Sequence, residues 1–403
     1  MIKILHTADW HIGKILHKQD LTEDIMLFFG WLEQLIKEAN IDVLLVSGDI
    51  FDLANPSNKD LKLYYQLLYR LSTTRVTIII TGGNHDSVSL LNAPSDILTN
   101  MNIHVVGGVP DDFEEQIIPI NDSKGVTKCI VLAVPFLRDR DLRMSISADE
   151  AVEKSQVIPM AIQKHYDALV TQAIEKYGNK IPIVAMGHLF MRGAITSDSE
   201  REIHVGNLMG LESMWLHPAI NYMALGHIHK PQRIDKNDHI RYSGSPIYLD
   251  FSEVGNQKTV IKIEVNEKEM LVEPIQIPTF RNLMRFKGSL ADTKILLNNY
   301  QHNSPLVTWV DIEIVEPTFD VAVTFAIEEL INNPSEHYKI IKSRITTGLE
   351  HQNDSDTSIM QENIDEISPF KILDRRLEPE EMNDDEKEKV KIAYAEILQM
   401  LHE

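Results

Sequence analysis

Cysteine is almost absent from this chain, which has a single thiol, Cys129, among 403 residues. One thiol excludes an internal disulfide and is typical of a protein from a reducing compartment. No run of residues approaches the roughly 18 uninterrupted apolar positions that a membrane-spanning helix requires. The first residues become polar too early for a secretion signal. We therefore expect a cytoplasmic protein with no membrane partner.

Basic residues are also scarce, with 39 Lys and Arg against 60 Asp and Glu, for a net charge of −21. This balance argues at first against a nucleic-acid partner, because binding to phosphates relies on positive charge. The excess of acidic residues is unevenly distributed along the chain, since residues 350–403 alone carry a net charge of −10. Several acidic residues in the remainder would face metal if the motifs below are real. The net charge therefore neither requires nor excludes DNA.

The length predicts two or three domains, at about 150 residues each. The composition, 43% hydrophobic and 25% charged, is that of a globular protein. Short apolar runs alternate with helical patterns such as 22–39 and 59–71, which predicts a layered α/β fold. The predicted buried strands are Ile2–Leu5, Val43–Ser47, Val76–Thr81, Ile130–Val134, Ile183–Met186 and Met223–Leu225.

The pattern changes after a hairpin-rich stretch at residues 239–272. Beyond a Pro-containing boundary at 274–278, a strand, a helix and a strand are predicted at 307–314, 321–331 and 338–345. A polar run at 348–363 is typical of a linker. We predict a first domain at 1–275, a small α+β domain at 276–347, a linker at 348–367 and a C-terminal helical segment at 368–403.

The C-terminal segment carries one apolar stripe. Its members are spaced by 4, 3 and 4 residues, which places them on one face of a helix. They are Val390, Tyr394, Ile397 and Leu401. The preceding linker favours a partner protein as the surface that this face covers, and packing on the chain's own domain is the alternative.

Polar clusters follow five of the predicted strands. Ligands of α/β proteins bind at the carboxyl ends of strands, so loops from distant parts of the chain can converge there. Glycines before several of the polar residues would let the backbone turn sharply. The clusters are Asp9-Trp10-His11, Gly48-Asp49-Ile50-Phe51-Asp52, Gly83-Asn84-His85-Asp86, Gly187-His188 and Gly226-His227-Ile228-His229.

The residue types in these clusters suit manganese, iron or zinc, because they offer carboxylate, amide and imidazole but no thiolate. Asp-x-His and His-x-His would place two side chains on one face of an extended backbone. The side chains are too many for one ion and fit two, with Asp49 as the bridge. The seven candidate ligands are Asp9, His11, Asp49, Asn84, His188, His227 and His229.

Two ions roughly 3.5–4 Å apart would clamp an in-line phosphoryl displacement and activate a bridging water. His85 directly follows the candidate ligand Asn84 and is placed to donate a proton to the leaving oxygen. Asp52 could hold the His85 ring in the right tautomer. Each motif alone is more often a loop, a turn or a helix cap. Their joint occurrence, in this order and each after a strand, favours a metal site.

The ordered set resembles the calcineurin-like metallophosphoesterase superfamily over roughly residues 1–255. Further stretches are similar to a narrower family, the SbcD nuclease subunits of bacteria. The superfamily motif alone would also fit phosphatases, and the downstream stretches favour the nuclease. The stretches are His6–Gly13, Gly83–Ser87, Ser197–Arg201, and Arg241–Pro246 followed by Asp250–Glu253.

The resemblance implies a four-layer metallophosphoesterase β-sandwich flanked by helices, a small α+β capping domain and a C-terminal helical segment. It implies that the seven residues ligate two Mn²⁺ ions and that His85 is catalytic. Asp52 partners this histidine in many phosphoesterases but not in every nuclease relative. The implied activity is a 3′–5′ exonuclease on duplex DNA and an endonuclease on single strands and hairpins, in DNA repair, recombination and replication.

The resemblance also implies partners for this activity. The nuclease works on the bacterial nucleoid with an SMC-like ATPase, whose coiled-coil base receives the C-terminal helix. It forms a homodimer through helices that would lie here at 59–71 and 90–101, stretches that could equally be core-facing helices. The capping domain overlies DNA, and its basic cluster could either contact phosphate or form a solvated edge. This cluster is Arg281, Arg285 and Lys287.

Two rival functions follow from the same residues. One is hydrolysis of a small phosphate ester, for which the capping domain and the C-terminal helix would be unnecessary. The other is a non-catalytic DNA-end scaffold, which the presence of all seven candidate ligands disfavours. Trp10 and Cys129 are expected to be core residues.

Overall fold

The computed structural model describes residues 1–138, 141–142, 157–197, 200, 210–266, 270–317, 321–333 and 335–347. The chain divides into two compact units, one of residues 1–315 and 320–345, the other of residues 316–319 and 346–403. Nearly all of the second unit lies outside the described residues. The predicted linker lies there, and so do the predicted partner-binding residues, which stay predictions: Val390, Tyr394, Ile397 and Leu401.

The first sheet has six strands. Four neighbours, β1, β4, β5 and β6, are parallel, and the antiparallel hairpin of β13 and β14 extends the sheet beside β1. Pro274 lies in β14, where an edge strand tolerates the missing amide. The strands in sheet order are β14 (Met270–Gln276), β13 (Thr259–Val265), β1 (Ile2–Thr7), β4 (Val43–Ser47), β5 (Thr77–Thr81) and β6 (Ile103–Val106).

The second sheet also has six strands, with a parallel centre and an antiparallel strand at each edge. Together the two sheets contain all six predicted strands, with their ends shifted by a few residues. The strands in sheet order are β11 (Gln232–Ile234), β12 (Asn237–Tyr242), β10 (Ile220–Gly226), β9 (Ile183–His188), β8 (Thr127–Ala133) and β7 (Ile117–Asn121).

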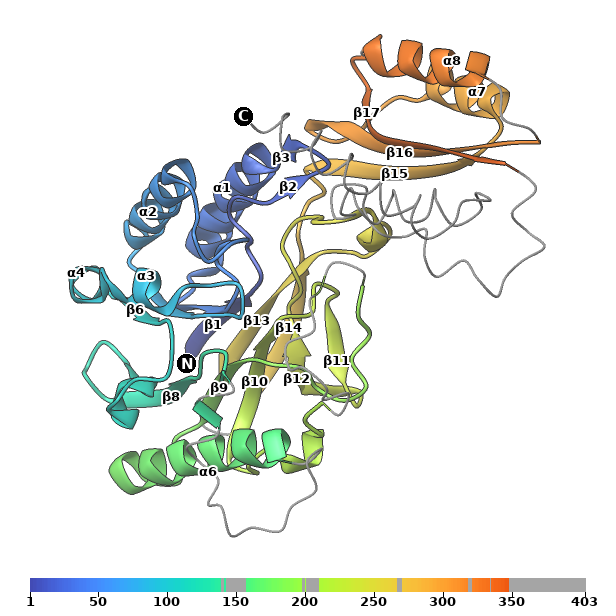
Figure 1. Ribbon diagram of the computed structural model, residues 1–403. Coiled ribbons are helices and arrows are strands. Elements are labelled where there is room, and N and C mark those ends of the chain that lie inside the picture. The colour runs from blue at the N-terminus through green and yellow to red at the C-terminus, as the bar shows by residue number, and fades with distance from the viewer. Residues whose placement is uncertain are drawn as a thin grey trace, which may run out of the picture. The chain divides into compact units, whose positions relative to one another are not determined.

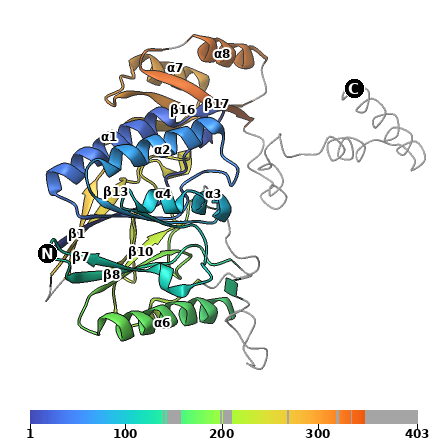
Figure 2. The ribbon, with the colours of Figure 1, turned by 90° about the vertical axis from the view of Figure 1, so that its left-hand side faces the viewer.

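The two sheets pack face to face and are covered by helices on their outer faces (Figures 1 and 2). Successive residues of a strand point to opposite faces. In β4, Val43 and Leu45 lie in the apolar cluster between the sheets, whereas Leu44 and Val46 lie in the cluster under the helices. A strand that is buried on both faces is apolar throughout, as this one is. The four-layer α/β fold predicted from the sequence is confirmed.

The helices over the first sheet are α1 (Thr22–Ala39), α2 (Asn58–Ser72), α3 (Val88–Asn92) and α4 (Ser95–Thr99), and α6 (Val157–Tyr177) covers the second sheet. A capping box of Ser57 and Asp60 begins α2. The single helix predicted at 90–101 is wrong, because Pro94 separates α3 from α4. Proline has no amide hydrogen and disfavours helix in the residue before it. No helix of the described residues could cross a membrane.

A third, three-stranded sheet follows with its own apolar core, as predicted for residues 276–347. It belongs to the first compact unit. The predicted boundary falls at the end of β14, which four residues separate from β15, and the division into domains stays a prediction. The elements are β15 (Arg281–Gly288), α7 (Leu290–Asn299), β16 (Leu306–Glu316), α8 (Val321–Asn332) and β17 (Tyr338–Thr347).

A small hairpin follows the loop that carries His11. It consists of β2 (Ile15–Leu16) and β3 (Gln19–Asp20). Leu16 is buried and anchors it in the core. Gln19 accepts a hydrogen bond from Lys339 of β17 at 2.7 Å. The hairpin therefore links the loop after β1 to the third sheet.

Candidate metal centre

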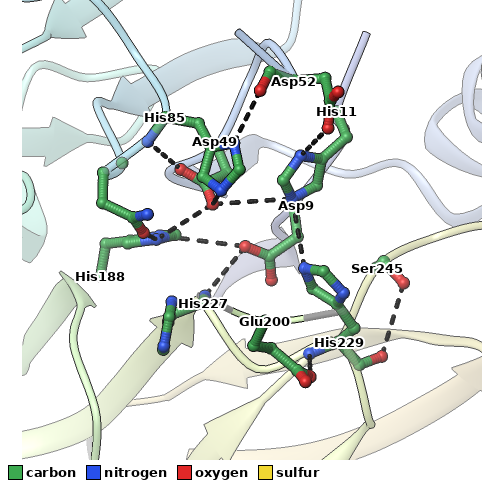
Figure 3. Close-up of polar contacts among 12 residues, drawn as sticks. Asp9, His11, Asp49, Asp52, His85, His188, Glu200, His227, His229 and Ser245 are labelled. Atoms are coloured by element: carbon green, nitrogen blue, oxygen red, sulfur yellow. Dashed lines mark hydrogen bonds and ion pairs between the residues drawn. The ribbon is translucent and has the colours of Figure 1, made fainter. Parts of the chain in front are cut away.

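The polar clusters converge at the carboxyl ends of the central strands of both sheets (Figure 3). The first sheet supplies Asp9 after β1, Asp49 after β4, and Asn84 and His85 after β5. The second sheet supplies His188 at the end of β9, and His227 and His229 after β10. Residues up to 220 positions apart in sequence therefore meet where the two parallel centres end side by side.

The backbone of the Asp-x-His motif is not extended, contrary to the prediction. Asp9 and His11 have φ values of 54° and 44°, and Asp49 has 49°, all in the left-handed region. Hydrogen bonds between the two loops hold this conformation: the Asp9 amide donates to the Gly48 carbonyl at 3.1 Å and the His11 amide to the Asp49 carbonyl at 3.0 Å. Strained non-glycine residues persist where the surroundings over-determine them, and they cluster at functional sites.

The glycines of these motifs mainly allow neighbouring loops to approach each other closely, and only one of them is needed for a sharp turn of the backbone. Only Gly48, of the glycines that precede the candidate ligands, has a positive φ, +82°. A Cβ on Gly83 would lie 2.1 Å from Asp49 Oδ1, and one on Gly226 would lie 1.7 Å from the Ser47 carbonyl oxygen. Any larger residue would push the loops apart.

Asp9, His11 and His229 form the first group of potential ligands. The Nε2 atoms of His11 and His229 face each other at 3.2 Å, and all three residues are at most 3% exposed. Asp9 Oδ2 is buried and has no hydrogen-bond partner among the described residues. A buried carboxylate oxygen without a partner is costly, and two facing imidazole nitrogens need a proton or a cation between them. The donor set and its geometry therefore fit a divalent ion.

Asp9, Asp49 and His188 form the second group. Asp49 Oδ2 lies 3.4 Å from His188 Nε2 and 3.6 Å from His11 Nε2, so this carboxylate reaches a histidine of each group. That position supports Asp49 as the bridge, although Asp9 belongs to both groups as well. Asn84 Oδ1 lies 2.9 Å from His188 Nε2.

His227 is the least engaged of the candidate ligands. Its backbone amide donates to Asp9 Oδ1 at 2.9 Å, and its ring centroid lies 5.4 Å from that of His188. Burial, followed by the charge of His188, lowers the pKa of His227 well below the ordinary value. Its role as a ligand rests on burial next to the second group and stays a prediction.

His85 is held by Asp52, but through a different atom from the one predicted. His85 Nδ1 lies 2.7 Å from the backbone carbonyl oxygen of Asp52. The Asp52 carboxylate instead lies 3.2 Å from His11 Nδ1 and 3.2 Å from Lys14 Nζ. The turn after Asp49 directs the carboxylate toward His11 and Lys14, while the carbonyl makes the hydrogen bond with His85. With Nδ1–H donating to this carbonyl, His85 Nε2 is the atom that faces Asp49, at 4.0 Å.

Carboxylates and imidazoles crowd together in the centre, and burial and mutual attraction shift their pKa values. Burial raises the pKa of Asp9 to about 7, against the attraction of His188. The pKa of Asp49 lies well below its ordinary value, since His188 and His11 together outweigh burial. Burial lowers the pKa of His188, but Asp49 and Asp9 raise it to about 9. A proton on His188 thus compensates charge that bound cations would compensate in its place.

Sequence reasoning gave no role to Asp86, which fastens two of the loops together. Its Oδ2 accepts from the amides of Gly83 at 2.8 Å and Ile50 at 3.1 Å, and its Oδ1 accepts from the Phe51 amide at 3.0 Å. Arg138 in turn donates to the Asp86 carbonyl at 2.8 Å. Its place in the Gly-Asn-His-Asp motif was the only signal in the sequence.

Two glutamates support His229 and were also missed. Glu253 Oε1 lies 3.1 Å from His229 Nδ1. Glu200 Oε1 accepts from the His229 amide at 2.8 Å (Figure 3). Glu200 also accepts from Ser197, through the amide at 2.6 Å and the hydroxyl at 2.8 Å. Both glutamates lie in stretches that carried the narrower family resemblance. These stretches therefore contact the centre although they supply none of the seven candidate ligands.

The basic cluster predicted to bind DNA is largely engaged within the protein. Arg281 is 7% exposed, makes a bidentate contact with Asp24 of α1 at 2.9–3.1 Å and stacks on Trp309 at 4.0 Å. These contacts give Arg281 a structural role, and its predicted DNA-binding role stays a prediction. Arg285 and Lys287 are more exposed and pair with Asp311 at 3.2 Å and Glu313 at 2.7 Å, so their DNA role stays a prediction.

Comparison with known proteins agrees with this geometry. The model of the calcineurin-like phosphoesterase family matches residues 2–231. The chain is 32% identical to the SbcD component of the SbcCD nuclease from Escherichia coli K12, over 99% of this chain and 98% of the relative.

Two further relatives carry the same name. The Rhodobacter capsulatus protein is 34% identical over 66% of each chain. The Bacillus subtilis protein is 29% identical over 78% of this chain and 79% of the relative. This chain belongs to the calcineurin-like phosphoesterase family and, within it, to the family of the SbcD components of SbcCD nucleases.

Proposed function

We propose that this protein is a metal-dependent nuclease that hydrolyses phosphodiester bonds of DNA with two divalent ions, Mn²⁺ being the expected metal. One observation carries the proposal: His11 Nε2 and His229 Nε2 face each other at 3.2 Å beside the unpartnered, buried Asp9 Oδ2. Its relatives are named as nuclease subunits, which supports the choice of substrate class.

The residues divide between two metal positions. Asp9, His11 and His229 would hold one ion, Asn84, His188 and His227 the other, and Asp49 would lie between them. Two bound divalent ions supply Lewis acidity for the phosphoryl oxygens and a water of lowered pKa. Oxygen and imidazole ligands without thiolate suit Mn²⁺.

His85 is the proposed proton donor to the departing sugar oxygen. The Asp52 carbonyl engages Nδ1, so the proton of the imidazolium that is transferred sits on Nε2, the atom on the side of Asp49. The backbone amide of His85 also donates to Asp49 Oδ1 at 3.0 Å. The same carboxylate thus orients both the acid and the centre in which it acts.

The proposed substrates are DNA ends and hairpins, cut as a 3′–5′ exonuclease on duplex and as an endonuclease on single strands and hairpins in the cytoplasm. The proposed partner is an SMC-like ATPase, which the C-terminal segment at 368–403 would bind. A homodimer through the stretches 59–71 and 90–101 is supported by exposed apolar side chains on α2 and α4. They are Tyr65 at 38%, Tyr69 at 64% and Ile97 at 70% exposure.

A nuclease assay with Mn²⁺ tests the proposal, on blunt duplex and hairpin DNA, with and without the ATPase partner and ATP. We expect cleavage that EDTA abolishes, and much lower turnover of p-nitrophenyl phosphate. Preferential hydrolysis of that small ester would favour a phosphomonoesterase. Binding of DNA ends without any cleavage in the presence of Mn²⁺ and the partner would favour a scaffold. Either result would overturn the proposal.

A further inference from the structure

The three histidines nearest the metal positions have different groups beside Nδ1. His229 Nδ1 is hydrogen-bonded to the Glu253 carboxylate at 3.1 Å, whereas His11 Nδ1 lies 3.2 Å from the Asp52 carboxylate without a hydrogen bond to it. His188 Nδ1 is hydrogen-bonded to a neutral group, the Ser47 carbonyl, at 3.0 Å. The first metal position therefore has one imidazole hydrogen-bonded to a carboxylate and a second with a carboxylate nearby, and the second position has one imidazole hydrogen-bonded to a peptide group.

Glu253 is held more rigidly than a carboxylate on a surface turn. It is the last residue of the 3₁₀ turn Phe251–Glu253 and is fully buried. Its Oε2 accepts from Lys258 Nζ at 2.6 Å and from the Leu249 amide at 3.2 Å, and Ser245 Oγ lies 3.4 Å away. Its carboxylate is thereby fixed in the orientation that presents Oε1 to His229.

Lys258 closes this network. Its side chain is 6% exposed, and its Nζ donates to Ser245 Oγ at 2.7 Å and to the His229 carbonyl at 3.3 Å as well as to Glu253. Lys258 thus contacts both the carboxylate and the backbone of the residue that it supports. A buried ion pair contributes little stability compared with apolar residues of the same volume, so stability alone does not account for this pair.

The network dictates the state of the His229 ring. An ionised carboxylate only accepts hydrogen bonds, so the proton of the neutral ring must sit on Nδ1. Nε2 then carries the lone pair, directed at His11 Nε2 and the first metal position. A carboxylate behind an imidazole also raises its basicity as a ligand, and losing such a partner typically lowers metal affinity roughly 10–100-fold.

We propose that Glu253 is a positioning residue which, together with Lys258, fixes the tautomer of His229 and makes the metal position formed by Asp9, His11 and His229 the tighter of the two. This inference rests on the metal binding of the proposed function. The second position, with an amide ligand and a carbonyl-backed histidine, fills at higher metal concentration.

Titration of the full-length protein with Mn²⁺, followed by calorimetry and by EPR of the free ion, tests the inference. Wild-type protein is expected to show a tight and a weak site. Glu253→Gln should weaken the tight site roughly 10–100-fold and leave the weak site within about threefold. Asn84→Ala should weaken the weak site. The control variant Glu264→Gln makes the same change near the end of β13 and should alter the affinity of neither site.

A second variant guards against misfolding, because Glu253→Gln leaves Lys258 buried without a counter-charge. The double variant Glu253→Gln/Lys258→Met removes both charges and should weaken the tight site by the same factor. ¹⁵N NMR of the metal-free protein reads the His229 tautomer directly: we expect Nδ1–H alone in the wild type and a mixture in both variants.

The outcomes distinguish failure of the role of Glu253 from failure of the proposed nuclease function. A double variant that keeps two wild-type affinities and a pure Nδ1–H tautomer would overturn the role of Glu253 and leave the proposed nuclease intact. The same holds if Glu253→Gln and Asn84→Ala weaken one and the same site. Wild-type protein that binds no Mn²⁺ at all would overturn the proposed function together with the inference.

Discussion

Charged residues are arranged in opposite ways in the metal centre and in the third sheet. In the centre, carboxylates and imidazoles crowd together and leave Asp9 Oδ2 without a partner among the described residues. In the sheet, the predicted DNA-binding cations each face an acid, Arg285 with Asp311 and Lys287 with Glu313. An unpartnered buried oxygen does not by itself identify a ligand site, since Asp311 Oδ1 in the sheet also has no hydrogen-bond partner among the described residues. In the centre the unpartnered oxygen lies among further potential metal ligands, whereas in the sheet a cation pairs with the same carboxylate.

The largest expected effect comes from removing the groups that face the reaction. Asn84→Ala or His85→Leu should abolish Mn²⁺-dependent cleavage of duplex ends, because the first removes an amide ligand and the second the proton donor. General acid catalysis alone contributes roughly 10²–10⁴-fold. Circular dichroism should show that the fold survives. Wild-type digestion rates in either variant would contradict the assignment.

Loss of Arg281 should lower the stability of the protein, whereas loss of residues in the metal centre should lower its activity. Arg281→Ala leaves Asp24 buried without its partner and removes the stacking on Trp309. Breaking a buried pair costs about 3–5 kcal/mol in the free energy of unfolding. Urea denaturation measures this, with Arg285→Ala as the control. A loss of DNA affinity at unchanged stability would instead support the role predicted from the sequence.

Asp52→Asn should weaken Mn²⁺ binding less than Glu253→Gln does. The Asp52 side chain is 14% exposed and Glu253 is fully buried, so water can replace more of what Asp52 provides. We expect about tenfold weaker Mn²⁺ binding. Cleavage at saturating Mn²⁺ should stay within a few-fold, because the Asp52 carbonyl still holds His85. A collapse of the rate under those conditions would show that the carboxylate itself serves His85.

The smallest effects are expected in the third sheet. Arg285→Ala and Lys287→Ala remove exposed ion pairs, which are worth about 0–1 kcal/mol of stability each. If these cations also reach phosphate, each change should weaken DNA binding and lower the salt dependence of log K by about 1. Binding measured from low to high salt checks this, and an unchanged slope would assign both residues to the fold alone.

Strand and helix patterns were readable because they depend on local periodicity. The run Val43–Ser47 coincides with β4, and the helix at 22–39 coincides with α1. The single helix expected at 90–101 failed at Pro94, where an apolar pattern persists although the backbone cannot continue as a helix. Local periodicity thus predicted the strands and helices of each layer better than the points at which a helix is interrupted.

The sequence predicted which residues form the candidate site but not the contacts that they make. The seven potential ligands stand out because each follows or ends an apolar strand. Glu253 and Asp86 do not stand out, because their roles depend on hydrogen bonds to residues that only folding brings near. Likewise, nothing in the sequence distinguishes Arg281, which binds Asp24 across 257 positions, from Arg285, which stays half exposed.

The order of strands and polar clusters along the chain determined the layered fold and the family of this protein, because periodicity and spacing are properties of the chain itself. Tertiary structure decided which atom of Asp52 faces His85, which cations are consumed by ion pairs, and which carboxylates back the histidines. The reason is physical: hydrogen bonds and ion pairs depend on ångström-scale distances between segments that are remote in sequence.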